Sequence, residues 1–257
     1  MSAVSYPLYA DLKNKTVLIS GGGSGIGASF VEAFAGQGSR VAFFDIQEEV
    51  SRELVQKLSS TGAELLFVKC DLTDIEALKK GVAEVETKLG AVRVLINNAA
   101  SDERHEPEDV TPEYWEQRLR LNFSHHFFSA QAVKPAMAKA GGGAIINMGS
   151  CSWHMAMEFM PGYTASKAAI EGLTQSLARA YGKERIRVNC IIPGQVWTDR
   201  QMKEIMTPEY EIFMTEKQCL PDRILPEDVA QLALFLASDA GRMCTRRNYF
   251  MDAGIGA

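Results

Sequence analysis

The sequence predicts a single α/β domain, built on a parallel β-sheet with helices on both faces. Three observations support this fold class. Short apolar, β-branched segments alternate with longer segments of helical periodicity, an order typical of parallel sheets. A glycine-rich turn follows the first apolar segment and opens the first helical one. The 257 residues, 46% of them hydrophobic, contain no internal repeat or low-complexity linker and suit one domain over 1–257, although length alone would also allow two.

The expected elements follow one another along the whole chain. The expected strands are residues 16–20, 41–45, 65–70, 94–97, 144–149, 186–192 and 247–251. The expected helices lie near residues 28–37, 48–60, 74–89, 112–138, 162–182 and 226–239. Residues 1–11 form an N-terminal extension. The looser stretch at about 197–225, which contains Met202, Met206, Met214, Pro208 and Pro221, is a candidate substrate lid or an ordinary surface excursion.

The glycine-rich turn is the first indication of a ligand. The strand at residues 16–20 runs directly into residues 21–27, with the sequence GGGSGIG, and a helical pattern follows from about Ala28. Glycines let the backbone approach a pyrophosphate, and a helix start offers unpaired N–H groups and a positive dipole end. Such turns also occur for steric reasons, but the place of this one between strand and helix favours a dinucleotide site.

Asp45 ends the second strand, 24 residues after Gly21. This is close to the offset of an acidic residue that bonds the ribose hydroxyls of a dinucleotide. Its carboxylate would repel a 2′-phosphate, and Ser24 adds no cation to the turn. NAD is therefore favoured over NADP, which stays the weaker alternative. Asp45 can also cap the helix that starts near Glu48, and the two roles are compatible.

The ends of the next two strands extend this site. Asp71, after the third strand, is a candidate acceptor for the adenine amino group. Asn98 and Ala99 follow the fourth strand, where small residues leave room for a ligand. Open α/β sheets bind their ligands at this carboxyl edge.

A second group of residues suggests proton transfer. Tyr163 and Lys167 are four positions apart in an expected helix, so their side chains share one face. A tyrosine with a pKa of about 10 is a poor base at neutral pH, but a fixed cation beside it favours the phenolate. Ser150, thirteen residues before Tyr163, brings a hydroxyl suited to holding a substrate oxygen. Such a pair is more often an ordinary surface pair; beside a dinucleotide turn it suggests proton transfer coupled to hydride transfer.

In this order, the motifs resemble the short-chain dehydrogenase/reductase family from about Leu12 to Gly254. The resemblance implies a Rossmann-type, doubly wound parallel sheet of seven strands in the order 3-2-1-4-5-6-7. The matching segments are Ser20 to Gly27, Asp71-Leu72, Asn97-Asn98-Ala99, Leu121-Asn122, Ser150, Tyr163 to Lys167, Pro193-Gly194 and Asp252-Ala253-Gly254.

The resemblance also implies roles for single residues. Tyr163 is similar to the general acid/base of the family, and Lys167 to its pKa-lowering partner and ribose ligand. Ser150 resembles the donor to the substrate oxygen, and Asn122 the residue that holds a proton-relaying water. Thr198 matches the position that bonds the nicotinamide carboxamide. The cofactor contacts implied in this way are Gly21, Ser24, Gly25, Ile26, Gly27, Asp45, Asp71, Leu72, Asn98, Ala99, Tyr163, Lys167, Pro193, Gly194, Val196 and Thr198.

Four positions depart from the family pattern. Ser20 stands where threonine is usual, and Ala100 where glycine is usual. Arg246 follows Thr245 in place of a common glycine, and Ala253 replaces the middle residue of Asp-Gly-Gly. These changes affect loop geometry and subunit contacts, while the residues expected to do chemistry are kept.

The segments after the fourth and fifth strands, residues 102–105 and 150–154, resemble those of bacterial NAD-dependent aldose 1-dehydrogenases, especially the D-xylose type. This implies hydride transfer from C1 of an aldose such as D-xylose, L-arabinose, D-galactose or L-fucose to NAD, which gives an aldonolactone. Trp153 offers a face for the apolar side of a sugar, although core packing is an equal alternative. The expected substrate contacts are Ser150, Trp153, His154, Tyr163, Gln195, Asp102, Arg104 and His105, with Glu158 nearby.

Three alternatives stay open. The same four residues serve a dehydrogenase of a deoxy-keto sugar acid, in which Arg104 would bind the carboxylate, or of another secondary alcohol or ketone. A non-catalytic nucleotide sensor and a structural subunit with a vestigial site belong to other classes. The complete set of Asn122, Ser150, Tyr163 and Lys167 disfavours both.

Composition excludes several other classes of protein. The formal net charge of −5 argues against a nucleic-acid-binding surface, and no apolar run is long enough for a membrane span. The first eleven residues lack the pattern of a secretory signal, and five scattered cysteines suit reduced thiols, so a cytoplasmic location is expected. The adjacent His125 and His126 are interpreted as packing or surface residues, and no metal site is expected. The family resemblance implies a homodimer or homotetramer, which often pairs the helices near 112–138 and 162–182.

Overall fold

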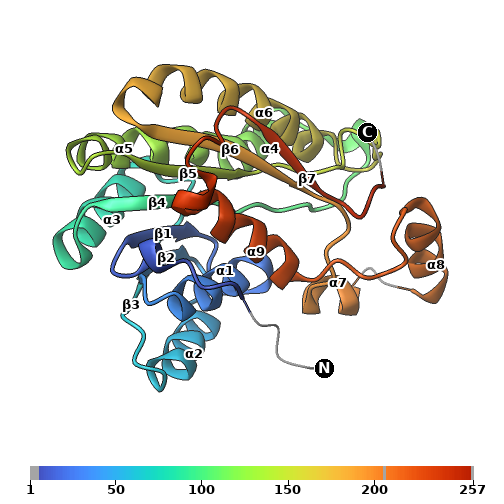
Figure 1. The fold of residues 1–257 in the computed structure, drawn as a ribbon. Helices are drawn as coiled ribbons and strands as arrows, with labels where there is room; N and C mark the ends of the chain where they lie inside the picture. Colours follow the sequence, from blue (N-terminus) through green and yellow to red (C-terminus); the bar gives the residue numbers. More distant parts are fainter. Residues whose placement is uncertain (1–5, 205–206, 256–257) are drawn as a thin grey trace.

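A computed structural model describes residues 6–204 and 207–255 and contains one parallel sheet (Figure 1). Within these residues the seven strands lie in the order β3-β2-β1-β4-β5-β6-β7, and every neighbouring pair is parallel. This confirms the predicted fold class and strand order. The strands are β1 (Thr16–Ser20), β2 (Arg40–Asp45), β3 (Leu65–Lys69), β4 (Val92–Asn97), β5 (Gly143–Met148), β6 (Ile186–Pro193) and β7 (Asn248–Met251).

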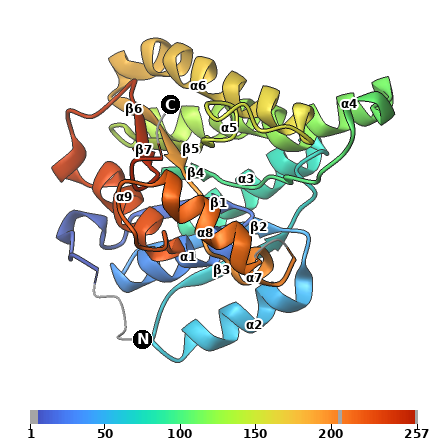
Figure 2. The same cartoon turned by 90° about the vertical axis from the view of Figure 1, so that its right-hand side faces the viewer.

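Helices cover both faces of the sheet (Figures 1 and 2). One face carries α1 (Gly25–Gly36), α2 (Glu48–Ser59) and α9 (Pro226–Ala237). The other face carries α3 (Ile75–Leu89), α5 (His125–Lys139) and α6 (Pro161–Tyr181), with α4 (Pro112–Leu119) beside α6. Two short helices, α7 (Asp199–Glu204) and α8 (Pro208–Lys217), lie at the right of Figure 1, outside these layers.

Alternate residues of each central strand face opposite layers, which is why these strands are apolar throughout. Val17 and Ile19 of β1 join the core under α1 and α9, whereas Leu18 joins the core under α3 and α5. Val94 and Ile96 of β4 face the first core in the same way. Continuous burial on both faces is typical of parallel sheets, and it explains why the strands could be predicted from apolar runs in the sequence.

The sheet reverses its winding between β1 and β4. From β1 the chain order runs through β2 to β3 on one side, and from β4 to β7 on the other. Connections therefore leave the carboxyl ends of β1 and β4 in opposite directions and open a crevice there. The glycine turn follows β1, and Asn98 follows β4, so both line this crevice.

One expected helix is divided. Instead of a continuous helix near 112–138, the chain forms α4, a π-helical turn over Arg120–Ser124 and then α5. A π turn inserts an extra residue into the helix and shifts the direction in which side chains project. Asn122 lies at its centre and is fully buried.

The segment predicted to be loose contains regular structure. Residues 197–225 (hereafter the lid segment) include α7 and α8. Met202 is exposed, whereas Met214 on α8 is buried. Two parts of these predictions lie outside the described residues: Met206 of the lid segment and residues 1–5 of the N-terminal extension. The described part of that extension is anchored where the Tyr9 N–H donates to Gln37 Oε1 at 2.7 Å.

Gly27 is the glycine that this packing requires most strictly. A Cβ at Gly27 would lie 1.7 Å from the Gly21 carbonyl oxygen, so Gly27→Ala should lower the free energy of unfolding by about 2 kcal/mol or more. Gly36, at the other end of α1, meets nothing within 4 Å. Gly36→Ala should raise that free energy by about 0.5–1 kcal/mol through helix propensity. Urea unfolding of both variants checks the pair, and equal effects would contradict the packing argument.

Candidate active site

The glycine turn forms a cradle at the start of α1. Gly21 and Gly25 adopt positive φ angles of 65° and 54°, which favour glycine. Ser24 precedes α1 in an extended conformation, and its side chain makes no capping hydrogen bond to the helix. The first N–H groups of α1 are thus not capped by Ser24, and this end of the helix suits a negatively charged pyrophosphate. Ile26 is half-buried and Gly27 is buried.

Ser20 and Asn98 join this turn to β4. The Ser20 hydroxyl accepts hydrogen bonds from the N–H groups of Asn98 (2.8 Å) and Ala99 (3.1 Å). The Asn98 amide donates to the carbonyl oxygens of Ser20 (3.1 Å) and Gly21 (2.9 Å). The hydroxyl kept at Ser20 therefore fixes the two strand ends to each other and sets the floor of the crevice.

Asp45 is buried at the end of β2 and faces the glycine turn. Its Oδ2 accepts from the Gly23 N–H at 2.8 Å, and its Oδ1 accepts from the Gln47 N–H at 2.9 Å, just before α2. The carboxylate thus lies beside the turn and bonds the N–H of Gln47, which precedes α2, so it does not itself cap that helix. Its position beside the turn fits a dinucleotide whose ribose hydroxyls donate to it.

The remaining predicted cofactor residues lie at the same edge of the sheet. Asp71 is exposed, and its Oδ1 accepts from Thr73, while Leu72 is buried behind it. Beyond β6, Gly194 is half-buried, Val196 is buried, and Thr198 lies close to the glycine turn. A Cβ built on Gly25 would lie 3.4 Å from Thr198 Cγ2. The ends of β1, β2, β3, β4 and β6 therefore converge on one crevice.

Tyr163 and Lys167 occupy the first turns of α6, which begins at Pro161, a residue with no N–H to leave unpaired. Lys167 Nζ lies 5.4 Å from the centroid of the Tyr163 ring, as their shared helix face predicts. The ammonium is 2% exposed and donates to the carbonyl oxygen of Met148, at the end of β5, at 2.7 Å. Ser150 follows the same strand, and its hydroxyl, which accepts from the Ser152 N–H at 3.1 Å, is near enough to Tyr163 to lower the pKa of the phenol.

Burial shifts the pKa values of both groups towards their neutral forms. Desolvation raises the pKa of Tyr163 above its usual value, and the nearby Ser150 hydroxyl partly opposes this. Desolvation lowers the pKa of Lys167 to about 8. The raised pKa of Tyr163 is opposite in direction to the effect expected of Lys167 from the sequence, because removal from water outweighs nearby charges. A working phenolate here needs stabilisation by cations in the filled site, to which a nicotinamidium ring would contribute.

Asn122 acts as a clamp on the loop after β4. Its Oδ1 accepts from the Ser101 N–H at 2.8 Å, and its Nδ2 donates to the Ser101 carbonyl oxygen at 3.1 Å. The π turn directs this side chain out of the helix towards the loop. Both side-chain atoms are thereby engaged, and the loop is fixed one residue before Asp102.

A buried polar network lies beneath Lys167. The Asn147 Oδ1 accepts from Asn97 Nδ2 at 2.9 Å and lies 3.3 Å from His126 Nδ1, while its amide donates to Thr174 at 3.0 Å. His125 and His126 are fully buried, so the packing interpretation of this pair holds and the surface one does not. Burial and the nearby Lys167 lower the pKa of His125 to about 3, which keeps it neutral.

Two predicted sugar contacts are engaged with α6. Trp153 Nε1 donates to Glu171 Oε1 at 2.7 Å, and His154 Nε2 lies 2.9 Å from the same oxygen. Asn248 of β7 donates to the other carboxylate oxygen of Glu171. Glu158, in the same loop, is exposed. Trp153 Nε1 and His154 Nε2 thus have a partner within the protein, and the two rings lie against each other with centroids 3.7 Å apart.

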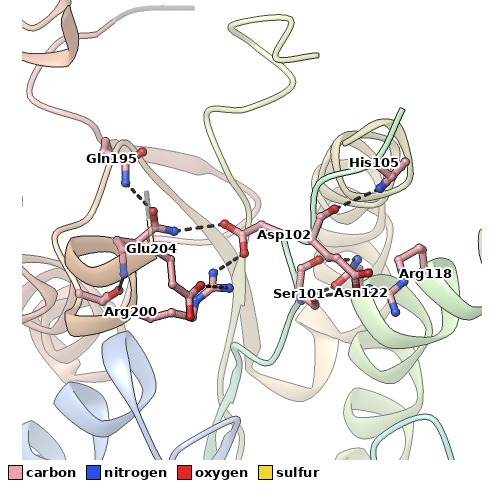
Figure 3. Close-up of polar contacts among 11 residues, drawn as sticks. Ser101, Asp102, His105, Arg118, Asn122, Gln195, Arg200 and Glu204 are labelled. Atoms are coloured by element: carbon pink, nitrogen blue, oxygen red, sulfur yellow. Dashed lines mark hydrogen bonds and ion pairs between the residues drawn. The ribbon is translucent and has the colours of Figure 1, made fainter. Parts of the chain in front are cut away.

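The other predicted sugar contacts belong to the loop after β4 and to the segment after β6, and Figure 3 shows the polar contacts between these two segments. Asp102 receives hydrogen bonds from Arg200 and, at 3.1 Å, from Gln201 Nε2. Gln195 donates to Gln201 Oε1 at 3.3 Å. His105 lies 3.0 Å from the Tyr114 hydroxyl and has turned away from Asp102 in Figure 3. Arg104 is exposed.

Sequence reasoning missed three residues of this site: Arg118, Arg200 and Gln201. Arg118 is buried and donates to Glu103 at 2.8 Å and to Ser101 at 3.4 Å, so it supports the same loop as Asn122. Arg200 and Gln201 hold α7 to Asp102. The polar triplet Asp199-Arg200-Gln201, directly after Thr198, was the available signal, but the partner of Arg200 lies 98 residues away in sequence.

The described residues contain neither a cluster of candidate metal ligands nor a helix suited to span a membrane. Across 6–204 and 207–255, no three side chains of His, Cys, Asp or Glu gather as metal ligands would. No helix in that part of the chain has the length and apolar character to cross a bilayer.

Relatives of known name match the chain over nearly its full length. A model of the family described as enoyl-(acyl carrier protein) reductase matches residues 21–256. The D-xylose 1-dehydrogenase of Caulobacter vibrioides is 48% identical over 251 residues, 98% of this chain and 99% of the relative. The probable galactose dehydrogenase of Rhizobium meliloti is 45% identical over 248 residues, 96% and 97% of the two chains. Among solved structures, a blue fluorescent protein from a metagenomic library in complex with NADPH has a TM-score of 0.89 at 31% identity, and the match covers 96% of this chain and all of that one.

Burial of Lys167 predicts how stability depends on pH. A pKa lowered from 10.5 to about 8 means that the unfolded chain binds more protons between these values, so stability should rise with pH across that window. At neutral pH the buried charge costs ~3 kcal/mol, at about 1.4 kcal/mol per pH unit. Lys167→Met removes this cost but leaves the Met148 carbonyl unpaired, which costs about 1–3 kcal/mol.

The Lys167→Met variant should therefore be at least as stable as the wild type at neutral pH, and its stability should lack the rise above about pH 8. Urea unfolding at several pH values measures both quantities. Lys15→Met, which removes a half-buried surface lysine paired with Asp11, is the matched control. A loss of several kcal/mol confined to Lys167→Met at neutral pH would show that the lysine stabilises the fold.

Proposed function

Because the chain belongs to the short-chain dehydrogenase/reductase family, we propose that it oxidises C1 of an aldose and gives the aldonolactone. The observation that carries this proposal is the arrangement of Tyr163, Lys167 and Ser150 at the edge of a dinucleotide crevice. The two sugar-oxidising relatives, which match nearly the whole chain, support an aldose as the substrate.

The residues of the site divide the reaction between them. Ser150 donates to the anomeric oxygen and holds it beside Tyr163. The phenolate of Tyr163 takes the hydroxyl proton while C1 loses hydride, so C1 and its oxygen form the carbonyl of the lactone. The nicotinamide, when bound, accepts that hydride. Lys167 binds the ribose and brings positive charge to the phenolate, and its pKa of about 8 lets it exchange protons near neutral pH.

The engaged side chain of Asn122 restricts its part in proton relay. Its Oδ1 and Nδ2 both bond Ser101, so a water held at this position would bind the Asn122 backbone. In this arrangement the Asn122 side chain positions the loop that carries Asp102. The Asn122 backbone would bind the water that exchanges protons with Lys167. This retains the family role within the geometry of the π turn.

NAD is the proposed cofactor. The buried carboxylate of Asp45 beside the Gly23 N–H supports recognition of free ribose hydroxyls and disfavours a 2′-phosphate. The proposed contacts are those at the strand ends described above, with Asp71 at the adenine and Thr198 at the carboxamide. NADP remains the weaker alternative, and a structural relative was solved with NADPH.

Oxidation of a deoxy-keto sugar acid is the second candidate, supported by one observation. Burial raises the pKa of Tyr210 on α8 and the exposed Arg104 partly opposes this, so a cation is available near α8 to bind a carboxylate. We further propose that the protein is a homodimer or homotetramer that pairs α4, α5 and α6, and the exposed Trp115 on α4 supports this. A cytoplasmic location is also proposed.

A substrate panel tests the proposed function. Purified protein is incubated with NAD and D-xylose, L-arabinose, D-galactose, L-fucose, a deoxy-keto sugar acid or simple secondary alcohols, and NADH is followed by absorbance. We expect the highest kcat/KM for an aldose, with lactone as the product. A preference for the sugar acid would select the second candidate, and no NAD reduction with any substrate would refute the function.

Tyr163→Phe identifies the base in the same assay. The variant should lose kcat by two to four orders of magnitude, the usual worth of general-base catalysis, while NADH still binds. Tyr210→Phe, a change of the same kind on α8, should retain most of kcat. Substantial turnover by Tyr163→Phe would remove the assigned base.

Asp45 should set the choice between NAD and NADP. Asp45→Ser removes the negative charge that faces the ribose and should raise the ratio of kcat/KM for NADP to that for NAD at least tenfold. Glu48→Gln, which removes a neighbouring carboxylate paired with Arg52 and Lys69, should leave the ratio within about twofold. An unchanged ratio in Asp45→Ser would place the selecting group elsewhere.

A further inference from the structure

An ion pair between Asp102 and Arg200 joins the loop after β4 to α7. Asp102 belongs to the loop after β4, and Arg200 belongs to α7, 98 residues later. The Asp102 side chain is 19% exposed, and its second oxygen accepts from Gln201 at 3.1 Å. Both oxygens of Asp102 are thus bonded to α7, and Figure 3 shows the carboxylate between the two groups of residues.

The Asp102 side of this bridge is firmly held. Asn122 bonds Ser101 on both backbone atoms, and the His105 N–H donates to the Phe159 carbonyl oxygen at 2.7 Å. Phe159 lies four residues before Tyr163, so the loop is fixed both to the π turn and to the chain that enters α6. The position of Asp102 relative to Tyr163 therefore depends on rigid elements, whereas Arg200 comes from a short surface helix.

Both charges of the pair act on Tyr163. Asp102 raises the pKa of the phenol, and Arg200 lowers it, so the two effects oppose each other. The influence is mutual, because the Tyr163 charge also acts on the pKa of Arg200. The other groups that bear on the phenol or on Lys167 are Ser150 and Cys151 after β5, His125 and His126 on α5, Cys190 on β6 and Lys167 on α6 itself.

We propose that Asp102 and Arg200 are positioning residues that form a neutralising bridge between the loop after β4 and α7, in which Arg200 compensates the effect of the Asp102 charge on Tyr163 while the pair holds α7 to the loop. A carboxylate near the base is useful for bonding sugar hydroxyls, but alone it would oppose the formation of a phenolate. Arg200 removes that conflict. The proposal rests on Tyr163 being the base of the proposed function.

Removing the positive or the negative member of the pair should move the pH profile of kcat/KM in opposite directions. In Arg200→Gln the Asp102 charge is uncompensated, so the rise of kcat/KM with pH should move to higher pH by about half a unit or more. In Asp102→Asn the cation remains alone, and the rise should move to lower pH by a similar amount. The double variant should return close to the wild-type position, and Arg200→Lys should restore it. All shifts should shrink at high salt.

Glu204→Gln is the matched control. Glu204 is a second carboxylate near Arg200, at 3.8 Å, but it is exposed and does not bond the loop after β4. Its removal should leave the pH profile unchanged. Single variants that move the rise in the same direction, or a double variant that keeps the shift of Arg200→Gln, would overturn the proposal, because loss of structure alone does not reverse sign or cancel.

The design separates this proposal from the proposed function. The pH profiles use whichever alcohol the substrate panel identifies, so an error about the sugar leaves them intact. If the panel yields no substrate, tyrosinate absorbance of the NAD complex, measured against Tyr163→Phe, reports the ionisation of Tyr163 directly. Shifts of opposite sign in that titration support the bridge even without turnover, and the absence of both shifts refutes it.

Discussion

Burial of a lysine ammonium at the carboxyl end of the sheet is the constraint on which the rest of the site depends. Lys167 is 2% exposed and donates to the Met148 carbonyl oxygen, so α6 is held at a fixed height above β5. Burial, and after it the charge of Lys167, lowers the pKa of the neighbouring His125 to about 3, so this histidine is neutral. With α6 held in this way, Tyr163 presents its hydroxyl to Ser150. The chain thus keeps an unfavourable charge where a charge is needed for chemistry.

Local patterns explain why so much of this molecule was predictable. The alternation of core faces along β1, the glycine turn and the spacing of Tyr163 and Lys167 all depend on residues within one or two elements. The contacts that the sequence did not predict join residues that are distant in sequence. The bond between Asp102 and Arg200 spans 98 positions, and Glu171 engages Trp153 from another element. The sequence gives no measure of how deeply a side chain is buried, so the raised pKa of Tyr163 could not be anticipated.

The loop after β4 and the lid segment (residues 197–225) differ in how they are anchored to the rest of the protein. The loop after β4 is fixed by Asn122, Arg118 and a backbone bond to Phe159. The lid segment reaches that loop through polar side chains of α7. The loop after β4 is thus anchored to several elements, whereas a surface segment such as 197–225 is the kind that varies most between related proteins.

The carboxylate of Glu171 links the catalytic helix to the last strand of the sheet. It bonds Trp153 and His154 from the loop after β5 and also Asn248 from β7. During translation the ribosome makes α6 some sixty residues or more before this strand exists. A nascent chain therefore contains α6 and the loop after β5 before Asn248, one of the partners of Glu171, has been made.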